Sequence, residues 1–234
     1  MRGDRAENTA RSPTPLYHPP MSVKQERALE IVHKLRRIYP RAKCALDFKS
    51  PFQLLVSTIL SAQTTDATVN QVGKGLYRTY PGPRELAAAK PTEVEKLIRS
   101  TGYFRNKAKM IQGASVALLE RHGGEVPGTM DELTALPGVG RKTANVVLAN
   151  AFGVASGVVV DTHVARLSQR LGLTRHDDPP KIEQDLMKLI PEKEWTKFAH
   201  RMILHGREVC LARAPKCGDC LINEFCPSAR RPLE

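Results

Sequence analysis

Apolar residues recur at helical spacing through almost the whole chain, and this periodicity limits the folds open to it. In the stretch ALEIVHKLRRIYP, Leu29, Val32, Leu35 and Ile38 fall on one face of a helix, and Pro40 stops the run. Similar runs, most of them closed by Gly or Pro, predict about ten helices. No segment shows convincing strand periodicity. We therefore expect an all-α protein.

Two further segments bear on how the helices are arranged. Ser50 followed by Pro51 is typical of a helix start, because Ser caps the first free N–H groups and Pro fits the first helical position. The apolar, glycine-bearing segment 152–160 has no such caps. It fits either a buried connection between two helical lobes or an ordinary interhelical loop.

The chain is strongly basic. Its 36 Lys and Arg residues against 24 Asp and Glu give a formal net charge of +12, which favours a polyanionic partner. Nucleic acid fits best, ahead of an acidic membrane surface or a basic surface kept only for solubility. No apolar run is long enough to span a bilayer, so we expect no membrane partner.

The N-terminal residues 1–22 hold four prolines and no apolar core of a signal peptide, so they predict a disordered basic, Pro-rich arm and no secretion signal. Asp4 and Glu7 argue against a mitochondrial transit peptide. In a bacterial source we would expect a cytoplasmic, nucleoid-associated protein.

A helix, a tight turn and a second helix are predicted in ELTALPGVGRKTANVVL. Glycines on either side of one small apolar residue let the turn expose its N–H groups, and the next helix begins with a basic pair, so the unit suits a phosphate. The alternative is a glycine-rich turn without a ligand. The residues expected to meet a DNA backbone here are Leu136, Gly138, Val139, Gly140 and Arg141.

Lys142 stands at the start of that second helix, where the helix dipole and Arg141 both disfavour its ammonium form. A neutral lysine is a nucleophile, whereas a charged one would neutralise a phosphate. Asp161 precedes THVARLSQRLG and suits an N-cap. A carboxylate can also accept a proton from a lysine, although an ionised carboxylate nearby would favour the charged lysine.

Four cysteines crowd into a Cys-x6-Cys-x2-Cys-x5-Cys array. Four thiolates so close in sequence suit a tetrahedral zinc ion or a [4Fe–4S] cluster, whereas two disulfides are disfavoured without an export signal. The fifth, Cys44, is most simply a buried small hydrophobe. The expected metal ligands are Cys210, Cys217, Cys220 and Cys226.

The stretches LPGVGRKTANVVL and VVVDTHVARLSQRLGL resemble the endonuclease III family of helix-hairpin-helix DNA glycosylases, and the resemblance extends over most of residues 23–226. It implies a bifunctional glycosylase and abasic-site lyase of base excision repair, acting as a monomer on double-stranded DNA that contains oxidised pyrimidines or abasic sites. Lys142 would attack the sugar C1′ with help from Asp161. The cysteine spacing would hold a [4Fe–4S] cluster.

The resemblance also implies further DNA contacts. Gln63, in LSAQTTD, would fill the hole left by an extruded base. Tyr103 stands where the family commonly has a leucine on the opposite-strand side, and it would stack there unless it and Phe104 belong to the core. The cluster loop would present Arg213 and Lys216 to phosphates, although Ala214 makes this loop less basic than is usual in the family.

Two helical lobes with the active site in the cleft between them are the arrangement that the family implies. One lobe would be a helical barrel with the hairpin, residues 44–154, and the other a cluster domain made of 23–43 and 155–234. Alternative functions are a glycosylase for mismatched adenine or pyrimidine dimers, and a non-catalytic DNA-binding module. Lys142 argues against the adenine enzyme.

Overall fold

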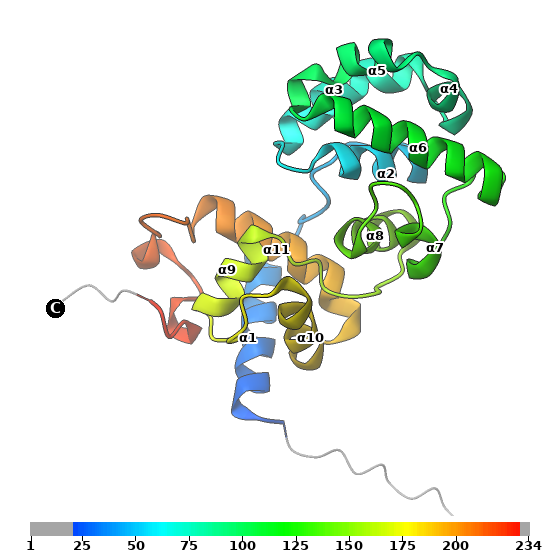
Figure 1. The fold of residues 1–234 in the computed structure, drawn as a ribbon. Helices are drawn as coiled ribbons and strands as arrows, with labels where there is room; N and C mark the ends of the chain where they lie inside the picture. Colours follow the sequence, from blue (N-terminus) through cyan, green and yellow to red (C-terminus); the bar gives the residue numbers. More distant parts are fainter. Residues whose placement is uncertain (1–20, 230–234) are drawn as a thin grey trace, which may run out of the picture.

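The computed structural model describes residues 21–229 and contains eleven α-helices and no strand in that range, so the predicted all-α class is confirmed (Figure 1). None of these helices combines the length and apolar composition needed to cross a membrane. The predicted arm falls outside the described residues except for Met21 and Ser22. The helices are α1 Val23–Ile38, α2 Pro51–Leu60, α3 Asp66–Thr79, α4 Pro83–Ala88, α5 Pro91–Ile98, α6 Phe104–His122, α7 Met130–Thr134, α8 Arg141–Val147, α9 Thr162–Arg170, α10 Pro179–Leu189 and α11 Trp195–Glu208.

The helix starts follow the local signals in the sequence. Ser50 caps α2 by accepting a hydrogen bond from the N–H of Gln53, and Pro51 is the first helical residue, as predicted. Asp161 caps α9 in the same way. Helix α4 was not predicted, although Pro83 directly after Gly82 is the same kind of start signal.

The buried apolar residues form two separate cores. The first runs from Leu46 to Leu148 and joins α2 to α8, and we call this part of the chain the barrel lobe. The second combines α1 with α9, α10 and α11, together with part of the C-terminal loop, and we call it the cluster lobe. Figure 1 shows α2 to α6 in one body and α1, α9, α10 and α11 in another, with α7 and α8 between them.

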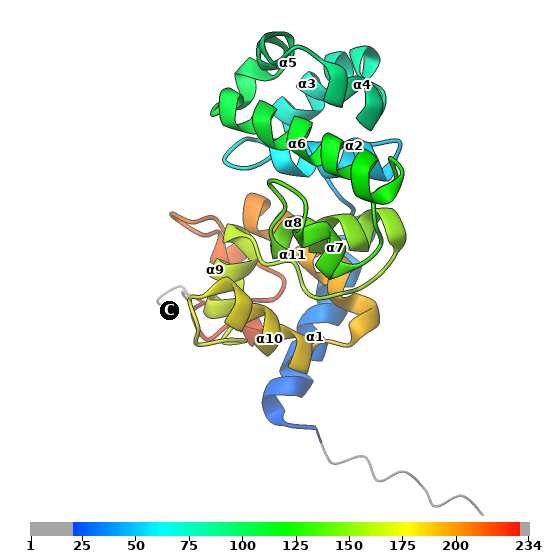
Figure 2. The ribbon, with the colours of Figure 1, turned by 45° about the vertical axis from the view of Figure 1, so that its right-hand side comes forward.

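The N-terminal helix α1 therefore packs against elements more than a hundred residues away along the chain. It contacts α10 and α11, and Figure 2 shows it among them and far from α3 and α5. From this arrangement we propose that the lobe boundaries lie near residues 44 and 154.

The segment 152–160 connects the lobes. Its last three valines, 158–160, are buried in the core of the cluster lobe, whereas Phe152 and Val154 are 39% and 46% exposed. It is thus a buried connection only in its second half.

Candidate active site

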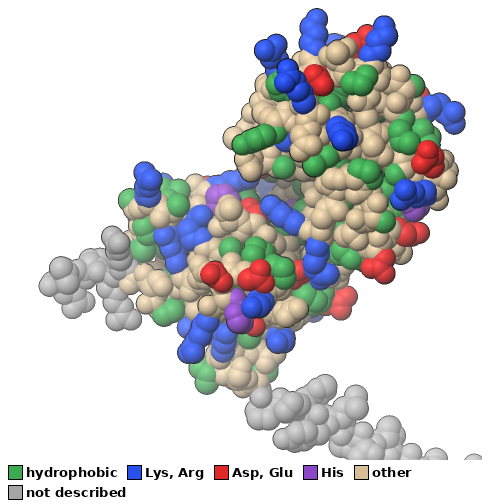
Figure 3. All heavy atoms as spheres, in the orientation of Figure 1, with side chains coloured by type: hydrophobic (Ala, Val, Ile, Leu, Met, Phe, Trp, Pro, Cys, Tyr) green, Lys and Arg blue, Asp and Glu red, His purple; other side chains and the backbone are tan. Residues whose placement is uncertain are grey.

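A pocket of about 130 Å³ lies between the two lobes, and both lobes contribute to its walls. Lys142, at the start of α8, and Asp161, just before α9, both line it. The structure therefore brings the two expected catalytic residues to one site, although 19 positions separate them in the sequence. Figure 3 shows a notch between the lobes, with Lys and Arg side chains on both of them.

Arg141 has a different setting from the one expected. Its Nε donates to Glu183 Oε2 at 2.9 Å and its Nη2 to Oε1 at 3.3 Å, and these hydrogen bonds raise the pKa of Arg141. Glu183 belongs to α10 of the cluster lobe and is buried. Arg141 therefore has a carboxylate partner in the other lobe, which the sequence did not indicate.

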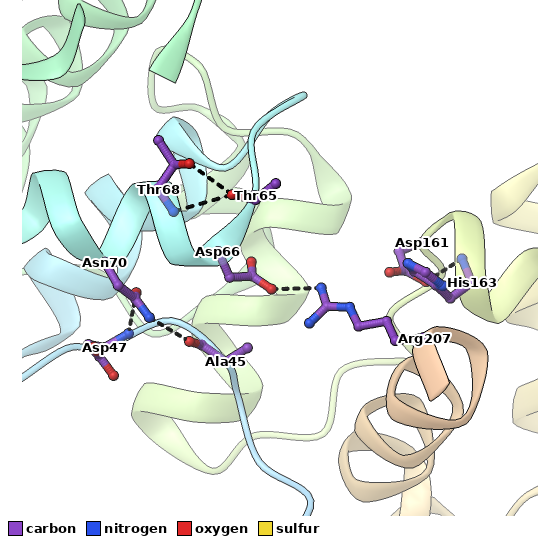
Figure 4. A network of polar contacts seen from close by, with 9 residues as sticks. All are labelled: Ala45, Asp47, Thr65, Asp66, Thr68, Asn70, Asp161, His163 and Arg207. Atoms are coloured by element: carbon purple, nitrogen blue, oxygen red, sulfur yellow. Dashed lines mark hydrogen bonds and ion pairs between the residues drawn. The ribbon is translucent and has the colours of Figure 1, made fainter. Parts of the chain in front are cut away.

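Asp161 is held firmly by the helix that it caps. Its Oδ1 accepts hydrogen bonds from the N–H groups of His163 at 2.9 Å and Val164 at 2.8 Å (Figure 4). These two bonds fix the side chain and use one oxygen only. Within residues 21–229, no hydrogen bond from the protein engages Oδ2, so the second oxygen can face a ligand in the pocket.

The pocket contains polar residues that the sequence did not single out. A π-helix, Leu148–Phe152, extends α8 and brings Asn150 to the wall, where His200 Nε2 donates to Asn150 Oδ1 at 2.9 Å. Burial, with a smaller contribution from the charge of Lys197, lowers the pKa of His200 to about 4. His200 is therefore neutral near pH 7. A π-helix is rare and often marks a functional site, but it has no simple sequence signal.

Cys44 also lines the pocket and is only partly buried, although it packs against the barrel core. Burial raises the pKa of its thiol. The expectation of a buried apolar residue is thus correct only in part, because one side of Cys44 faces the site.

An ion pair crosses from one lobe to the other beside this pocket. Arg207 Nη2 of α11 donates to Asp66 Oδ2 of α3 at 2.7 Å. Figure 4 shows the two side chains extended towards each other, with Asp161 on the far side of Arg207. No pattern in the sequence pointed to this contact, because 141 positions separate its partners.

The hairpin between α7 and α8 forms as predicted, but two of its residues are not free for a ligand. The side chains of Leu136 and Val139 are 3% and 7% exposed and belong to the barrel core, and the Val139 N–H donates to the Leu136 carbonyl. These two side chains anchor the turn from inside, so a contact of Leu136 or Val139 with DNA would involve the backbone, and it stays a prediction. Gly138 and Gly140 are exposed.

Gln63 and Tyr103, the expected wedge residues, line one further pocket of about 340 Å³, together with Gly138 of the hairpin. Gln63 is exposed and Tyr103 is 71% exposed, so the alternative that Tyr103 belongs to the core was wrong. Phe104 instead packs against the barrel core. The structure thus places two wedge candidates and the hairpin on one face.

The four clustered cysteines all line a cavity of about 360 Å³ in the cluster lobe. Arg170 donates to Cys210 Sγ at 3.3 Å, and Cys220 Sγ lies 3.4 Å from His205 Nε2. In the described part of the chain, no three Cys, His, Asp or Glu side chains are grouped closely enough to hold one metal ion. Four thiols spread around a cavity fit a multi-iron cluster better than a single zinc ion. Arg213 and Lys216 lie at the rim.

The family models of known proteins match two parts of the chain. The "HhH-GPD superfamily base excision DNA repair protein" model matches residues 56–192, and the "Iron-sulfur binding domain of endonuclease III" model matches residues 210–226. The second match confirms the predicted [4Fe–4S] cofactor.

Curated relatives are similar over nearly the full chain. Endonuclease III of Synechocystis sp. is 57% identical over 90% of this chain and 96% of its own length. Endonuclease III of Escherichia coli K12 is 41% identical, over 85% of this chain and 93% of its own.

Solved structures agree with the sequence comparisons. A non-covalent endonuclease III–DNA complex superposes with a TM-score of 0.84 at 45% identity, over 89% of this chain and 97% of that one. A trapped covalent endonuclease III–DNA intermediate gives the same TM-score and identity, over 89% of this chain and 98% of that one. The chain therefore belongs to the HhH-GPD superfamily of base excision DNA repair proteins and, within it, to the endonuclease III family.

Proposed function

We propose that this base excision repair enzyme removes oxidised pyrimidines of the thymine glycol type from double-stranded DNA and then nicks the strand through a lysine Schiff base. The observation that carries the proposal is the meeting of Lys142 and Asp161 on one pocket between the lobes. The endonuclease III structure described as a trapped covalent intermediate with DNA supports a covalent route.

In the proposed reaction, the damaged base leaves the stack and enters the site. The neutral Lys142 amine attacks C1′, and the bond from C1′ to the base breaks as the base departs with the electron pair and gains a proton. The nitrogen, now bonded to C1′, loses one of its two protons. The C1′–O4′ bond then breaks as O4′ takes up a proton, and the nitrogen lone pair forms a protonated imine with C1′. Loss of the C2′ proton then expels the 3′ phosphate by β-elimination.

Asp161 has two roles in this scheme. Its carboxylate stabilises the positive charge that develops on the sugar, and it accepts a proton from the Lys142 ammonium. The cap on α9 holds the carboxylate in place, so that little reorganisation is needed during the reaction.

DNA would bind across the exposed face of the hairpin. The N–H groups at Gly138 and Gly140 and the first turn of α8 favour a phosphate, and the net charge of +12 favours the polyanion in general. Gln63 and Tyr103 would fill the space that the extruded base leaves, with Arg213 and Lys216 on the flanking backbone. Relatives solved with DNA support this partner.

Cys210, Cys217, Cys220 and Cys226 would hold the [4Fe–4S] cluster, and the bound cluster supplies a covalent crosslink for the loop after α11. The chain's own residues prepare this site, since Arg170 donates to the Cys210 sulfur and to the carbonyls of Leu211 and Ala212.

Borohydride trapping tests the nucleophile. The wild-type enzyme should form a covalent adduct with duplex DNA containing thymine glycol, and Lys142→Ala should form none. An adduct in Lys142→Ala, or its absence in the wild type, would show that Lys142 is not the nucleophile.

A panel of duplexes tests the substrate class. Thymine glycol should be released, whereas mismatched adenine, pyrimidine dimers and undamaged duplex should not. Binding to all of them without cleavage would instead indicate a DNA-binding module.

A further inference from the structure

Lys107, near the start of α6, has an unusual setting for a lysine. The residue is only 4% exposed, and its Nζ donates three hydrogen bonds, to the Leu60 carbonyl at 2.9 Å, Thr64 Oγ1 at 2.7 Å and the Thr101 carbonyl at 2.8 Å. All three acceptors are neutral, and burial lowers the pKa of Lys107. An ammonium without a carboxylate partner is costly to bury, so an apolar residue of similar size would be the simpler choice for stability alone.

The three acceptors belong to two loops that carry the wedge candidates. Leu60 ends α2 and Thr64 lies just beyond Gln63, whereas Thr101 ends a short 3-10 helix two residues before Tyr103. Thr64 strengthens the link, because its hydroxyl also donates to the Thr101 carbonyl at 2.5 Å. Lys107 is therefore the shared hydrogen-bond donor that joins the loop after α2 to the loop before α6.

Both loops hold a residue in a strained backbone conformation. Gln63 has φ 52° and Tyr103 has φ 46°, in the left-handed region that side chains other than glycine rarely adopt. Such conformations are energetically costly and persist only where the surroundings enforce them. Since neither side chain is buried in the core, no core packing offsets this cost.

We propose that Lys107 is a positioning residue that sets Gln63 and Tyr103 as a rigid pair for insertion into the DNA stack. The inference rests on the proposed function, in which these two side chains enter duplex DNA. Under this proposal, extrusion of the base depends on Lys107, whereas the chemistry at C1′ does not.

The test compares Lys107→Met with Lys109→Met, which removes an exposed lysine from the same helix. Each variant is assayed on duplex DNA with thymine glycol and on a single strand with a preformed abasic site, which has no base pair to open. Lys107→Met should lose on the order of 100-fold in single-turnover base release from the duplex. Its strand cleavage at the single-stranded abasic site should stay within about twofold of wild type, and Lys109→Met should retain both activities. An equal loss on both substrates, or no loss on either, would overturn the proposal.

A second variant covers the case in which Lys107→Met does not fold. Thr64→Val keeps the shape of the side chain but removes the hydroxyl that links Lys107 to the Thr101 carbonyl. Thr64→Val should also lose base release from the duplex selectively, but by a smaller factor than Lys107→Met. The proposal is wrong if its activities on the duplex and on the single strand change together.

A mutant cycle identifies which claim has failed. If Lys107 acts through the wedge pair, its replacement should have little further effect in a Gln63→Ala/Tyr103→Ala background. A full additional loss there would overturn the positioning role. If the Gln63→Ala/Tyr103→Ala enzyme itself releases the base at the wild-type rate, the assignment of the wedge residues is wrong and the role of Lys107 falls with it. Borohydride trapping at Lys142 is independent of either result.

Discussion

Asp161 illustrates at the residue scale how one side chain can serve both folding and chemistry. Asparagine caps a helix as well as aspartate does, because its amide oxygen accepts the same N–H bonds. We therefore expect Asp161→Asn to leave the free energy of unfolding within about 0.5 kcal/mol of wild type. Glycosylase turnover should fall on the order of 100-fold, because the charge is lost. Urea unfolding and single-turnover kinetics measure the two effects.

The matched variant Asp161→Ala removes the cap as well as the charge. It should lose about 1 kcal/mol of stability in addition to the same loss of turnover. If Asp161→Asn keeps full activity, the carboxylate has only a structural role.

His200 predicts a dependence of stability on pH. Its pKa is lowered from 6.5 to about 4 by burial and by Lys197, so the unfolded chain binds a proton more readily than the folded one. The neutral ring therefore contributes its full share to the free energy of unfolding above pH 6.5, and this stabilisation is lost as the pH falls towards 4. As the pH falls from 6.5 to 4, the free energy of unfolding should decrease by up to about 3 kcal/mol more in the wild type than in His200→Gln.

Urea unfolding of both proteins at several pH values measures this difference. His205, whose pKa burial also lowers to about 4, is present in both and cancels. Equal losses in the two proteins would contradict the burial of a neutral His200.

Single-residue roles could be predicted where a local pattern carries them. Lys142 stands out because it follows the hairpin, and Asp161 because it precedes a helix. His200 and Lys107 could not be found, because nothing near them in the sequence reveals that other helices bury their charge-bearing groups.

At the element scale, the turn before α8 depends on one glycine. Gly138 has φ +75°, and a Cβ placed there would lie 2.8 Å from the Met110 Cβ. We expect Gly138→Ala to destabilise the protein by about 1–2 kcal/mol through the backbone conformation, with a further cost from this overlap. DNA affinity should fall with it, because the hairpin loses its shape. Thermal unfolding and a binding titration on undamaged duplex measure both.

Gly140 offers the control within the same turn. Its φ is −97°, and a Cβ placed there would have no neighbouring atom within 4 Å, so serine fits and caps α8. Gly140→Ser should be as stable as wild type. Equal destabilisation by the two changes would show that the conformation of Gly138 is not what matters.

The elements themselves were largely predictable, because most begin at a capping residue and end at Gly or Pro. Helix α4 was missed although Pro83 directly after Gly82 marks its start. The π-helix Leu148–Phe152 after α8 was missed because a π-helix has no simple sequence signal.

At the scale of the whole molecule, two ion pairs within residues 21–229 join the lobes, and they differ in burial. The Glu183 side chain is 7% exposed in its pair with Arg141, whereas Asp66 and Arg207 are 25% and 43% exposed. Arg141→Met leaves a buried carboxylate short of partners and should cost about 1–3 kcal/mol. Arg207→Met should cost less than about 1 kcal/mol, because water replaces the lost contact.

Urea unfolding of the two variants gives the comparison. Adding Glu183→Gln to Arg141→Met should recover part of the loss, since the buried charge is then removed. A larger loss in Arg207→Met than in Arg141→Met would contradict this ranking.

These contacts mark the limit of what the sequence could predict. The two-lobed class followed from the family resemblance. The pairing of Arg141 with Glu183 and of Asp66 with Arg207 did not, because each joins residues 42 or 141 positions apart that no local pattern connects.

The place of α1 in the cluster lobe has a consequence for biosynthesis. A ribosome releases α1 well before its packing partners α10 and α11, which come more than a hundred residues later in the chain. The barrel lobe is continuous in sequence, so it can fold while synthesis continues, as N-terminal domains commonly do. Until α10 and α11 are made, the apolar face of α1 is either exposed to solvent or bound by a chaperone. Iron would thus be loaded into a lobe that is complete only when α1 packs against α10 and α11.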